Sequence, residues 1–307
     1  MHARTSRVRV ARARPAVRLE VRAPAKINLD LRVLDLRPDG FHEVRTILQT
    51  VALHDTLTLT ARPGPLIVRS GSPWVPRDRD NLVWKAGAAL WRALGRSGQP
   101  TDVAVRIRKR VPAGAGLGGA SSDAAAALRA LRLVWAPAAS ARLLHEVAAA
   151  VGSDVAFFLR GGTMLATGRG ERTRALRALR RYDVVLASPP FAVSTPAAYR
   201  WWDEMPGLAE RTPAGWRAHP GRLRNDLEEP VVARHPAIGE AVARLRAAGA
   251  VRAAMTGSGS AVFGLFESTA AAARARRAAG GAGWRTTLTQ TVDASAYARL
   301  AAVVRMN

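Results

Sequence analysis

The chain has 307 residues, a length that fits about two domains of ordinary size. Hydrophobic residues make up 48% of it, which excludes a largely disordered protein. No apolar run approaches the ~20 residues that would span a membrane. Cysteine is absent, so disulfides, zinc–cysteine sites and thiol catalysis are excluded as well. These features indicate a globular cytoplasmic protein.

The formal net charge is +24, which invites comparison with nucleic-acid-binding proteins. The basic residues are spread along the whole chain rather than gathered in one stripe, so we expect no nucleic-acid partner. Only three of the 47 basic residues are lysines, namely Lys26, Lys85 and Lys109. A lysine in so arginine-rich a chain suggests a place where only a compact ammonium fits, with chance retention as the alternative.

The first elements in chain order are strands. Apolar and charged residues alternate over residues 17–22 and again over 29–33, with a break at Ala23-Pro24-Ala25-Lys26. This period of two predicts two half-buried strands. Arg37-Pro38-Asp39-Gly40 is a turn signal, and residues 56–60 predict a further strand.

The next part of the chain is predicted to contain helices as well as strands. Residues 81–94 have the apolar spacing of a helix, with Asp80 placed to cap its start. Residues 102–110 alternate like a strand, and after a run of glycines residues 121–134 predict an alanine-rich helix. A new strand is predicted at 184–187.

Strands and helices alternate without the regular rhythm of a doubly wound sheet, which favours an α+β fold of two domains. We place the boundary near residue 178, between an N-terminal domain at 18–178 and a C-terminal domain at 179–307. Residues 1–17 are basic and lack the apolar core of a secretory signal, so we expect a disordered extension.

The most informative motif lies between a predicted strand and a predicted helix. Glycines allow backbone N–H groups to approach an anion, and a helix N-terminus adds its positive dipole end. Two adjacent serines could cap the helix or bind a phosphate or its metal ion. The motif reads Pro112-Ala113-Gly114-Ala115-Gly116-Leu117-Gly118-Gly119-Ala120-Ser121-Ser122-Asp123.

Other nucleotide-binding loops fit this motif less well. A Walker A loop requires Gly-Lys-Ser/Thr where Ala120-Ser121 stands. Gly114, Gly116 and Gly119 match G-x-G-x-x-G, but no acidic residue about 20 positions on is placed to hold a ribose. The H-R-D and D-F-G motifs of protein kinases are absent. A purely structural turn remains as an alternative, although glycine this dense beside two serines favours a phosphate loop.

Three segments in order resemble the motifs of the GHMP kinases: Pro24-Ala25-Lys26-Ile27-Asn28-Leu29, the phosphate loop, and Met255-Thr256-Gly257-Ser258-Gly259-Ser260. The resemblance covers nearly the whole chain from about Val17. It implies an ATP- and Mg²⁺-dependent small-molecule kinase with a two-domain GHMP kinase fold. In this fold, an N-terminal α/β domain similar to a ribosomal-protein domain binds ATP, and a C-terminal α/β sandwich domain binds the substrate.

Further segments resemble one group within this family. These are residues 37–43, 152–158, 188–196 and 225–228. The group phosphorylates the 2-hydroxyl of a cytidine-diphosphate-linked methylerythritol in the non-mevalonate isoprenoid pathway. The chain differs from the pattern at Phe41, where tyrosine is usual, and at Ala120, where glycine is usual.

The resemblance implies roles for individual residues. Asp154 is expected to act as general base, and Lys26 to stabilise the developing alkoxide and the transferred phosphoryl group. Without the resemblance, a helix cap and a surface lysine are the ordinary interpretations. ATP is expected to bind at Pro112, Ala113, Gly114, Ala115, Gly116, Leu117, Gly118, Gly119, Ala120, Ser121, Ser122, Asn81 and Lys109, with Ser121 and Ser122 also as candidate metal ligands.

The substrate is expected to bind at a second set of residues. Phe41 and Tyr199 would stack on the cytosine, and His42 would form a hydrogen bond to it. The full set is Asn28, Phe41, His42, Thr195, Tyr199, Gly257 and Ser258. As ordinary alternatives, Phe41 would be a core residue and His42 a turn residue.

Three alternatives to this function remain open. The chain could be a GHMP kinase for mevalonate, homoserine or a sugar, but these substrates carry no base to stack on Phe41 and Tyr199. It could be a basic RNA-binding module, which would leave Lys26, Asn28 and Asp154 unexplained. It could be an inactive member of the family, which the presence of Lys26 and Asp154 argues against. We expect a monomer or a weak homodimer.

Overall fold

The computed structural model describes residues 17–206 and 223–306, so nearly all of the predicted extension at 1–17 lies outside the described residues. The described strands form two sheets. The first sheet contains β1 (Arg18–Leu36), β2 (His42–Pro65), β3 (Ile67–Ser70), β4 (Thr101–Arg108), β5 (Thr163–Thr167), β6 (Arg172–Ala175) and β11 (Val304–Met306). The second contains β7 (Asp183–Ser188), β8 (Arg252–Met255), β9 (Val262–Phe266) and β10 (Arg285–Gln290).

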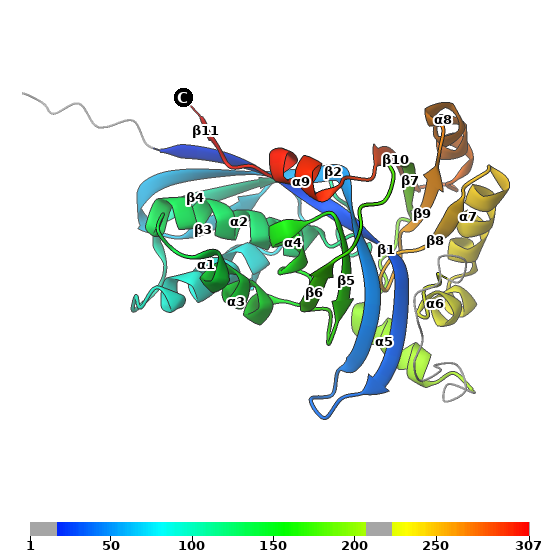
Figure 1. The fold of residues 1–307 in the computed structure, drawn as a ribbon, viewed down its shortest axis with the longest axis horizontal. Coiled ribbons are helices and arrows are strands. Elements are labelled where there is room, and N and C mark those ends of the chain that lie inside the picture. Colours follow the sequence, from blue (N-terminus) through cyan, green and yellow to red (C-terminus); the bar gives the residue numbers. More distant parts are fainter. Residues whose placement is uncertain (1–16, 207–222, 307) are drawn as a thin grey trace, which may run out of the picture.

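The helices of the described residues divide between the two sheets. Figure 1 shows α1 to α4 beside the first sheet and α7 and α8 beside the second. They are α1 (Leu82–Ala93), α2 (Gly119–Trp135), α3 (Ala141–Val151), α4 (Phe157–Arg160), α5 (Thr195–Asp203), α6 (Glu228–Arg234), α7 (Pro236–Ala247), α8 (Thr269–Ala278) and α9 (Ala294–Leu300), with the 3₁₀ turn η1 at Asp78–Asp80. The structure thus has the α+β architecture that the sequence predicts.

The strands of the first sheet follow the order β11-β1-β2-β4-β3, and β5 and β6 extend from β2. All these pairs are antiparallel except β3 with β4. The second sheet is antiparallel throughout, in the order β10-β7-β9-β8. Both sheets contribute buried side chains to separate apolar clusters, one around α2 and one around α7.

The strand β1 is longer than predicted. We expected two strands broken at Pro24, but the structure has one continuous strand whose pairing with β2 shifts between Pro24 and Lys26. Proline lacks an N–H donor, and a β-bulge is where a strand tolerates that loss. Next to the shift, the Lys26 N–H donates to the Leu117 carbonyl oxygen at 3.0 Å. The irregularity therefore joins β1 to the predicted phosphate loop.

The first helix also differs from the prediction at its cap. Asp80 lies in η1, and the cap of α1 is Asn81, whose side-chain oxygen accepts from the Val83 N–H at 2.9 Å. Asparagine is as good a cap as aspartate, so the two neighbours could not be told apart by type. The predicted helix at 121–134 is confirmed as α2, which begins slightly earlier.

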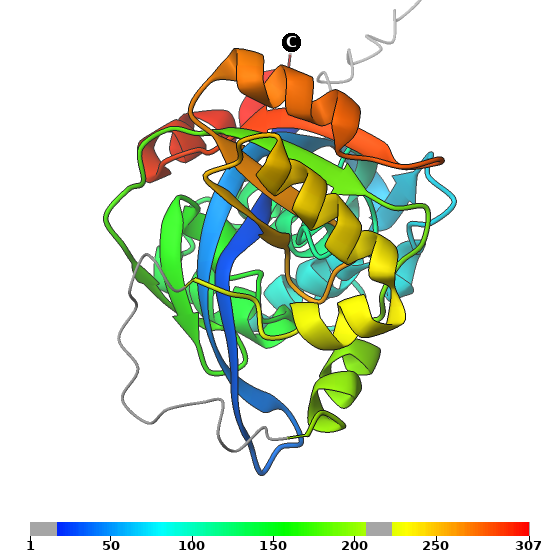
Figure 2. The same ribbon diagram turned by 90° about the vertical axis from the view of Figure 1, so that its right-hand side faces the viewer.

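The chain changes from the first sheet to the second between β6 and β7, around the predicted boundary at residue 178. The last strand, β11, returns to the first sheet and pairs with the start of β1. The long β1–β2 hairpin extends beyond the other strands of the first sheet, and α5 lies beside its far end (Figures 1 and 2). Residues from both halves of the chain thus meet along this hairpin.

Candidate active site

A cavity of about 880 Å³ lies between the phosphate loop, the β1–β2 hairpin and α5. Its lining comes from both predicted domains. Every residue that the sequence predicts for the site lines this cavity, with the exception of Ser122.

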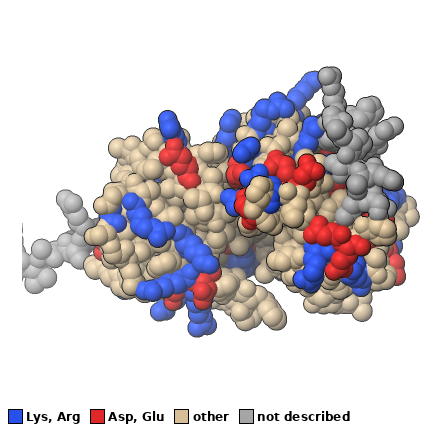
Figure 3. Space-filling model, turned by 90° about the horizontal axis from the view of Figure 1, so that it is seen from below, with Lys and Arg blue, Asp and Glu red and all other residues tan. Residues whose placement is uncertain are grey.

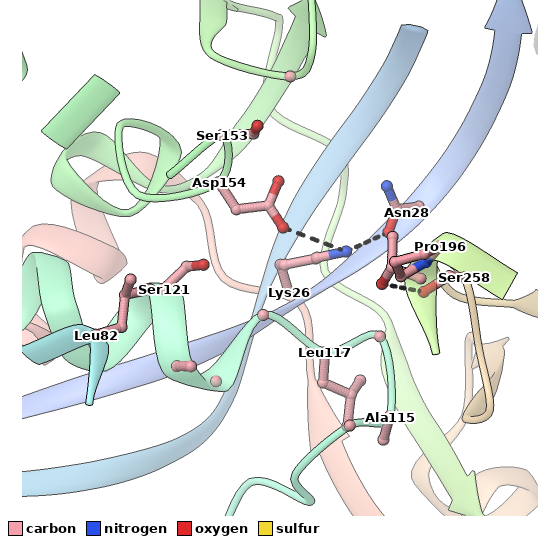
Figure 4. Close-up of a pocket in the computed structure, with 18 of the residues that line it drawn as sticks. Lys26, Asn28, Leu82, Ala115, Leu117, Ser121, Ser153, Asp154, Pro196 and Ser258 are labelled. Atoms are coloured by element: carbon pink, nitrogen blue, oxygen red, sulfur yellow. Dashed lines mark hydrogen bonds and ion pairs between the residues drawn. The ribbon is translucent and has the colours of Figure 1, made fainter. Parts of the chain in front are cut away.

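At the centre of the cavity, Lys26 and Asp154 face one another (Figure 4). The Lys26 Nζ lies 3.8 Å from the Asp154 Oδ2 and donates to the Asn28 Oδ1 at 2.5 Å. The Lys26 side chain is 5% exposed and that of Asp154 is 31% exposed. A buried cation and a more accessible carboxylate therefore stand side by side.

The surroundings of Lys26 lower the pKa of its ammonium. Burial disfavours the charged form and is the largest cause, while the Asp154 carboxylate opposes it. Space around the ammonium is limited: a Cβ at Gly257 would lie 3.3 Å from the Nζ, and one at Gly118 would lie 3.0 Å from the Lys26 Cγ. This packing suits a narrow lysine better than the wide fork of an arginine.

The phosphate loop has the backbone shape that its glycines predict. Gly114, Gly116 and Gly118 all have positive φ, which glycine adopts without strain. Gly118 is the cap residue of α2, so the N-terminal turn of that helix opens onto the cavity. A loop followed by a helix N-terminus in this way can bind an anion through backbone N–H groups.

The two serines after the loop face different surroundings. Ser121 lines the cavity, and Figure 4 shows its hydroxyl on the side where Lys26 and Asp154 lie. Ser122 is fully buried, and its hydroxyl donates to the Pro24 carbonyl oxygen at 2.6 Å. Ser121 therefore faces the cavity, whereas Ser122 holds the loop against β1.

A set of hydrogen bonds fixes Asn28 against the turn after β8. The Asn28 backbone N–H donates to the Thr256 Oγ1 at 3.0 Å, and its side-chain amide donates to the Thr46 Oγ1 at 2.8 Å. The Asn225 amide in turn donates to the Gly257 carbonyl oxygen at 2.8 Å. The segment that begins at Met255 thus packs directly beside the Lys26–Asn28 strand.

On the other side of that turn, the Ser258 hydroxyl lies 2.9 Å from the Thr195 Oγ1 (Figure 4). Thr195 is the first residue of α5, and both side chains line the cavity. This contact connects α5 to the Gly-Ser turn and fixes where the helix begins relative to Lys26.

Aromatic rings also line the cavity. The His42 ring stacks on Tyr199 with centroids 5.1 Å apart and 21° between the ring planes. Its Nε2 lies 2.8 Å from the Asp203 Oδ1. Burial, with a smaller effect of the Asp154 charge, raises the pKa of Tyr199, so this ring lies within electrostatic reach of the central carboxylate.

Phe41 occupies a more open position than His42. Its side chain is 55% exposed, and the Arg169 guanidinium lies 5.1 Å from the centre of its ring. Phe41 is therefore not a core residue. One face of its ring is occupied by a cation, and its exposure leaves further ring surface open to a ligand.

The two residues predicted for the adenosine side line the cavity, but their polar atoms are engaged. The Asn81 amide group donates to the Pro76 carbonyl oxygen at 2.7 Å in addition to capping α1. The Lys109 Nζ lies 2.5 Å from Asp55 Oδ2 and 2.8 Å from Asp123 Oδ2. Burial opposes the charge of Lys109, but the two carboxylates together raise its pKa.

Several lining residues were not predicted from the sequence. Asp203 lies one helical turn after Tyr199, a spacing that places two side chains on one helix face. Trp74 follows β3 in the chain and is 81% exposed, and a large exposed apolar side chain of this kind marks a binding surface. Arg169 had no local signal, since arginine is common throughout this chain.

The charges on the surface are distributed in separate groups. Figure 3 shows several clusters of Lys and Arg on one face, with Asp and Glu beside most of them.

The described residues contain no group of three or more His, Cys, Asp or Glu arranged to hold a metal ion. Within residues 17–206 and 223–306, no helix is long and apolar enough to cross a membrane.

Comparison with known protein families assigns both halves of the chain to one family. Residues 81–162 match the N-terminal domain of GHMP kinases, and residues 214–285 match the C-terminal domain of GHMP kinases. The first range contains the phosphate loop and Asp154, and the second contains the turn after β8.

Individual relatives are similar over most of the chain. A 4-diphosphocytidyl-2-C-methyl-D-erythritol kinase of Geobacillus thermodenitrificans is 41% identical over 82% of this chain and 89% of its own length. The enzyme with the same name from Anaeromyxobacter sp. strain K is 41% identical over 90% of this chain and 91% of its own.

Solved structures agree with these relatives. A crystal structure of 4-(cytidine 5'-diphospho)-2C-methyl-D-erythritol kinase superposes with a TM-score of 0.70 at 35% identity, over 89% of this chain and 98% of that chain. A homoserine kinase from Cytophaga hutchinsonii shares the fold, with a TM-score of 0.71 at 16% identity over 98% of this chain and 100% of that chain. The chain belongs to the GHMP kinase family, within the group of the 4-diphosphocytidyl-2-C-methyl-D-erythritol kinases.

Proposed function

We propose that this chain uses ATP to phosphorylate the 2-hydroxyl of 4-diphosphocytidyl-2-C-methyl-D-erythritol, a reaction of the non-mevalonate isoprenoid pathway, in the cytoplasm. The observation that carries the proposal is that one cavity contains the phosphate loop, the Lys26–Asp154 pair and the His42–Tyr199 stack. Two relatives named as kinases of this substrate match most of the chain, each at 41% identity.

Asp154 is the general base of the proposed reaction. Its carboxylate accepts the proton of the substrate hydroxyl, whose oxygen then forms a bond to the γ-phosphorus of ATP. The bond from that phosphorus to the bridging oxygen breaks, and ADP leaves with the electron pair. A carboxylate that positions and deprotonates the nucleophile is what phosphoryl transfer requires of a protein, and Asp154 is the accessible member of the central pair.

Lys26 supplies positive charge where negative charge develops. Its ammonium is buried and held between Asn28 and Asp154, so little reorganisation is needed when the alkoxide and phosphoryl charges form. A charge in such a fixed, water-poor position stabilises a transition state more than the same charge in solvent. The phosphate loop would hold the triphosphate through its backbone N–H groups and the α2 N-terminus.

Mg²⁺ would assist by neutralising the phosphate oxygens of ATP. The described residues contain no preformed carboxylate cluster, and Mg²⁺ in kinases is held largely by phosphates and water with few protein ligands. The Ser121 hydroxyl fits this role because it lines the cavity at the start of α2. Ser122 does not fit, because its hydroxyl is buried and bonded to Pro24.

The aromatic residues of the cavity would recognise the base. Phe41 and Tyr199 offer flat faces on which a cytosine can stack, and His42 offers a ring nitrogen for a hydrogen bond. Mevalonate, homoserine and sugars carry no such base. The similarity to the homoserine kinase is confined to the fold, at 16% identity.

The direct test is ADP release by purified protein supplied with ATP, Mg²⁺ and the cytidine substrate, beside an Asp154→Asn variant. The variant keeps the size and loses the basic group, so we expect turnover to fall by about 10²-fold or more. Release of ADP with mevalonate or homoserine instead would leave the family intact and disprove the cytosine assignment. Salt-sensitive RNA binding without any turnover would disprove the kinase.

A further inference from the structure

His42 is held on two sides by residues of α5. Tyr199 stacks against the flat face of its imidazole, and Asp203 lies 2.8 Å from its Nε2. Tyr199 and Asp203 are four residues apart in the helix, so both side chains project from the same face. The helix therefore fixes both the plane of the imidazole and the direction of one of its nitrogens.

The partner of Nε2 determines where the ring proton sits. A carboxylate oxygen only accepts hydrogen bonds, so the Nε2 must carry a proton to donate to Asp203. In a neutral imidazole the other nitrogen, Nδ1, is then an acceptor. Among the described residues, no side chain or backbone group forms a hydrogen bond to the His42 Nδ1, and His42 lines the cavity.

We propose that Asp203 is a positioning residue that fixes the Nε2-protonated tautomer of His42, so that Nδ1 accepts a hydrogen bond from the exocyclic amine of cytosine. This inference rests on the proposed function. It adds a source of selectivity for the base. Uracil carries a carbonyl oxygen at the position of that amine, so two acceptors would meet and a uridine substrate would be disfavoured.

His42 alone would not discriminate cytosine from uracil. Without an anchored partner, an imidazole exchanges between its two tautomers, and the second tautomer would present a donor to the base instead of an acceptor. The side chain of His42 is only 10% exposed, so water has limited access to compete for Nε2. Asp203 is 51% exposed, and its removal leaves no buried charge unpaired.

The first test reads the tautomer directly. ¹⁵N spectra of the free protein in weakly alkaline buffer should show a protonated Nε2 and an unprotonated Nδ1 for His42, whose signals a His42→Gln variant identifies. The Asp203→Ala variant should show a mixture of tautomers. A protonated Nδ1 in the wild type, or an unchanged spectrum in Asp203→Ala, would overturn the proposal.

The second test reads the consequence for the substrate. In Asp203→Ala the KM for the cytidine substrate should rise by about fivefold to tenfold, as expected for one weakened hydrogen bond, while the KM for ATP stays unchanged. The ratio of kcat/KM for the cytidine substrate over its uridine counterpart should fall by a similar factor. Equal ratios in variant and wild type would overturn the proposal even if the tautomer changed.

Glu204→Ala is a matched control for both tests. Glu204 is the next residue, is also 51% exposed and forms an ion pair with Arg234, but it does not line the cavity. It should change neither the His42 spectrum nor the KM values. If the wild type showed no turnover with the cytidine substrate, the proposed function and the role in base recognition would both fall, whatever the spectrum showed.

Discussion

A Cβ atom at Gly116 would lie 2.2 Å from the carbonyl oxygen of Thr256. Gly116 belongs to the phosphate loop, and Thr256 begins the turn after β8, so two motifs 140 residues apart are in backbone contact. The same turn bonds Asn28 through the Thr256 hydroxyl. The phosphate loop, the turn and the Lys26–Asn28 strand therefore form one packed unit around the central pair.

This contact predicts that Gly116→Ala disables the site. The methyl group would push two backbone segments apart, so we expect a large loss of kcat/KM for ATP as well as lower stability. The positive φ of +74° alone would cost about 1–2 kcal/mol for alanine. Urea unfolding and ATP kinetics measure the two effects.

Gly95→Ala separates the clash from the backbone strain. Gly95 has almost the same φ, +73°, and nothing lies within 4 Å of its added Cβ. It should lose stability only and keep its activity. If the two variants lost the same stability and both stayed active, the backbone contact between the phosphate loop and the turn would not be needed for activity.

Lys26→Met should slow turnover strongly without unfolding the protein. Methionine has a similar shape, and removing a charge whose burial already lowers its pKa relieves a desolvation cost. We expect kcat to fall on the order of 10²–10³-fold, with a free energy of unfolding equal to or above that of the wild type. Lys85→Met, at an exposed position of α1, is the control for losing a lysine. Near-normal turnover in Lys26→Met would contradict the electrostatic role.

Lys109→Met, in contrast, should lower the stability of the folded protein. Its ammonium lies between the buried carboxylates of Asp55 and Asp123, which raise its pKa, so we expect its charge to stabilise the folded state. Removing it leaves two carboxylates without their cation, at a cost of about 3–5 kcal/mol. Thermal or urea unfolding would measure this, and a stability equal to that of Lys85→Met would disprove the interpretation.

Much of the fold could be predicted because its signals are local. The alternation in β1 and β4 and the glycine run before α2 are patterns within a few residues. The central pair could be named only because the motifs resemble a family, since Lys26 and Asp154 lie on separate elements. No periodicity connects two such positions.

Two kinds of feature could not be predicted from the sequence: contacts between residues far apart in the chain, and the direction in which a side chain points. Asp203 acts on a histidine 161 residues away, and only the packing of α5 on the hairpin brings them together. The two adjacent serines illustrate orientation: neighbours on a helix point about 100° apart, so the two side chains face different surroundings. Ser122 turns inward to Pro24, and no pattern in the sequence indicates which of the two serines does so.

The stability of the protein should depend on pH through Asp30. This carboxyl is buried with one oxygen, Oδ2, lacking a partner among the described residues, and burial raises its pKa from 3.8 to about 6. Below pH 3.8 it is protonated in the folded and unfolded states alike. As the pH rises toward about 6, the unfolded chain releases the proton first, so stability is lost across this window.

Asp30→Asn tests this linkage because it keeps the shape and removes the titration. The free energy of unfolding of the wild type should fall relative to the variant between pH 3.8 and about 6, and the difference should level off above that. Asp35→Asn, at an exposed position of the same strand, should follow the wild type throughout. A difference that stayed constant with pH would mean that Asp30 has an ordinary pKa.

Phe41 should contribute to substrate binding but not to stability. Its ring is 55% exposed, so Phe41→Ala removes little buried surface, and urea unfolding should be unchanged. If a base stacks on this ring, its loss should raise the KM for the cytidine substrate by roughly 5- to 150-fold, in line with ~1–3 kcal/mol per stacked base. Phe41→Tyr retains the flat face and should keep the KM of the wild type.

Val251→Ala serves as the control for Phe41→Ala. Val251 is 54% exposed, which matches the exposure of Phe41, but it does not line the cavity. It should change neither the KM for the cytidine substrate nor that for ATP. Because Phe41 is proposed to stack on the base and not to contact ATP, its effect should also be absent from the KM for ATP. An equal rise in both KM values would mean that the ring helps to close the cavity as a whole and does not recognise the base.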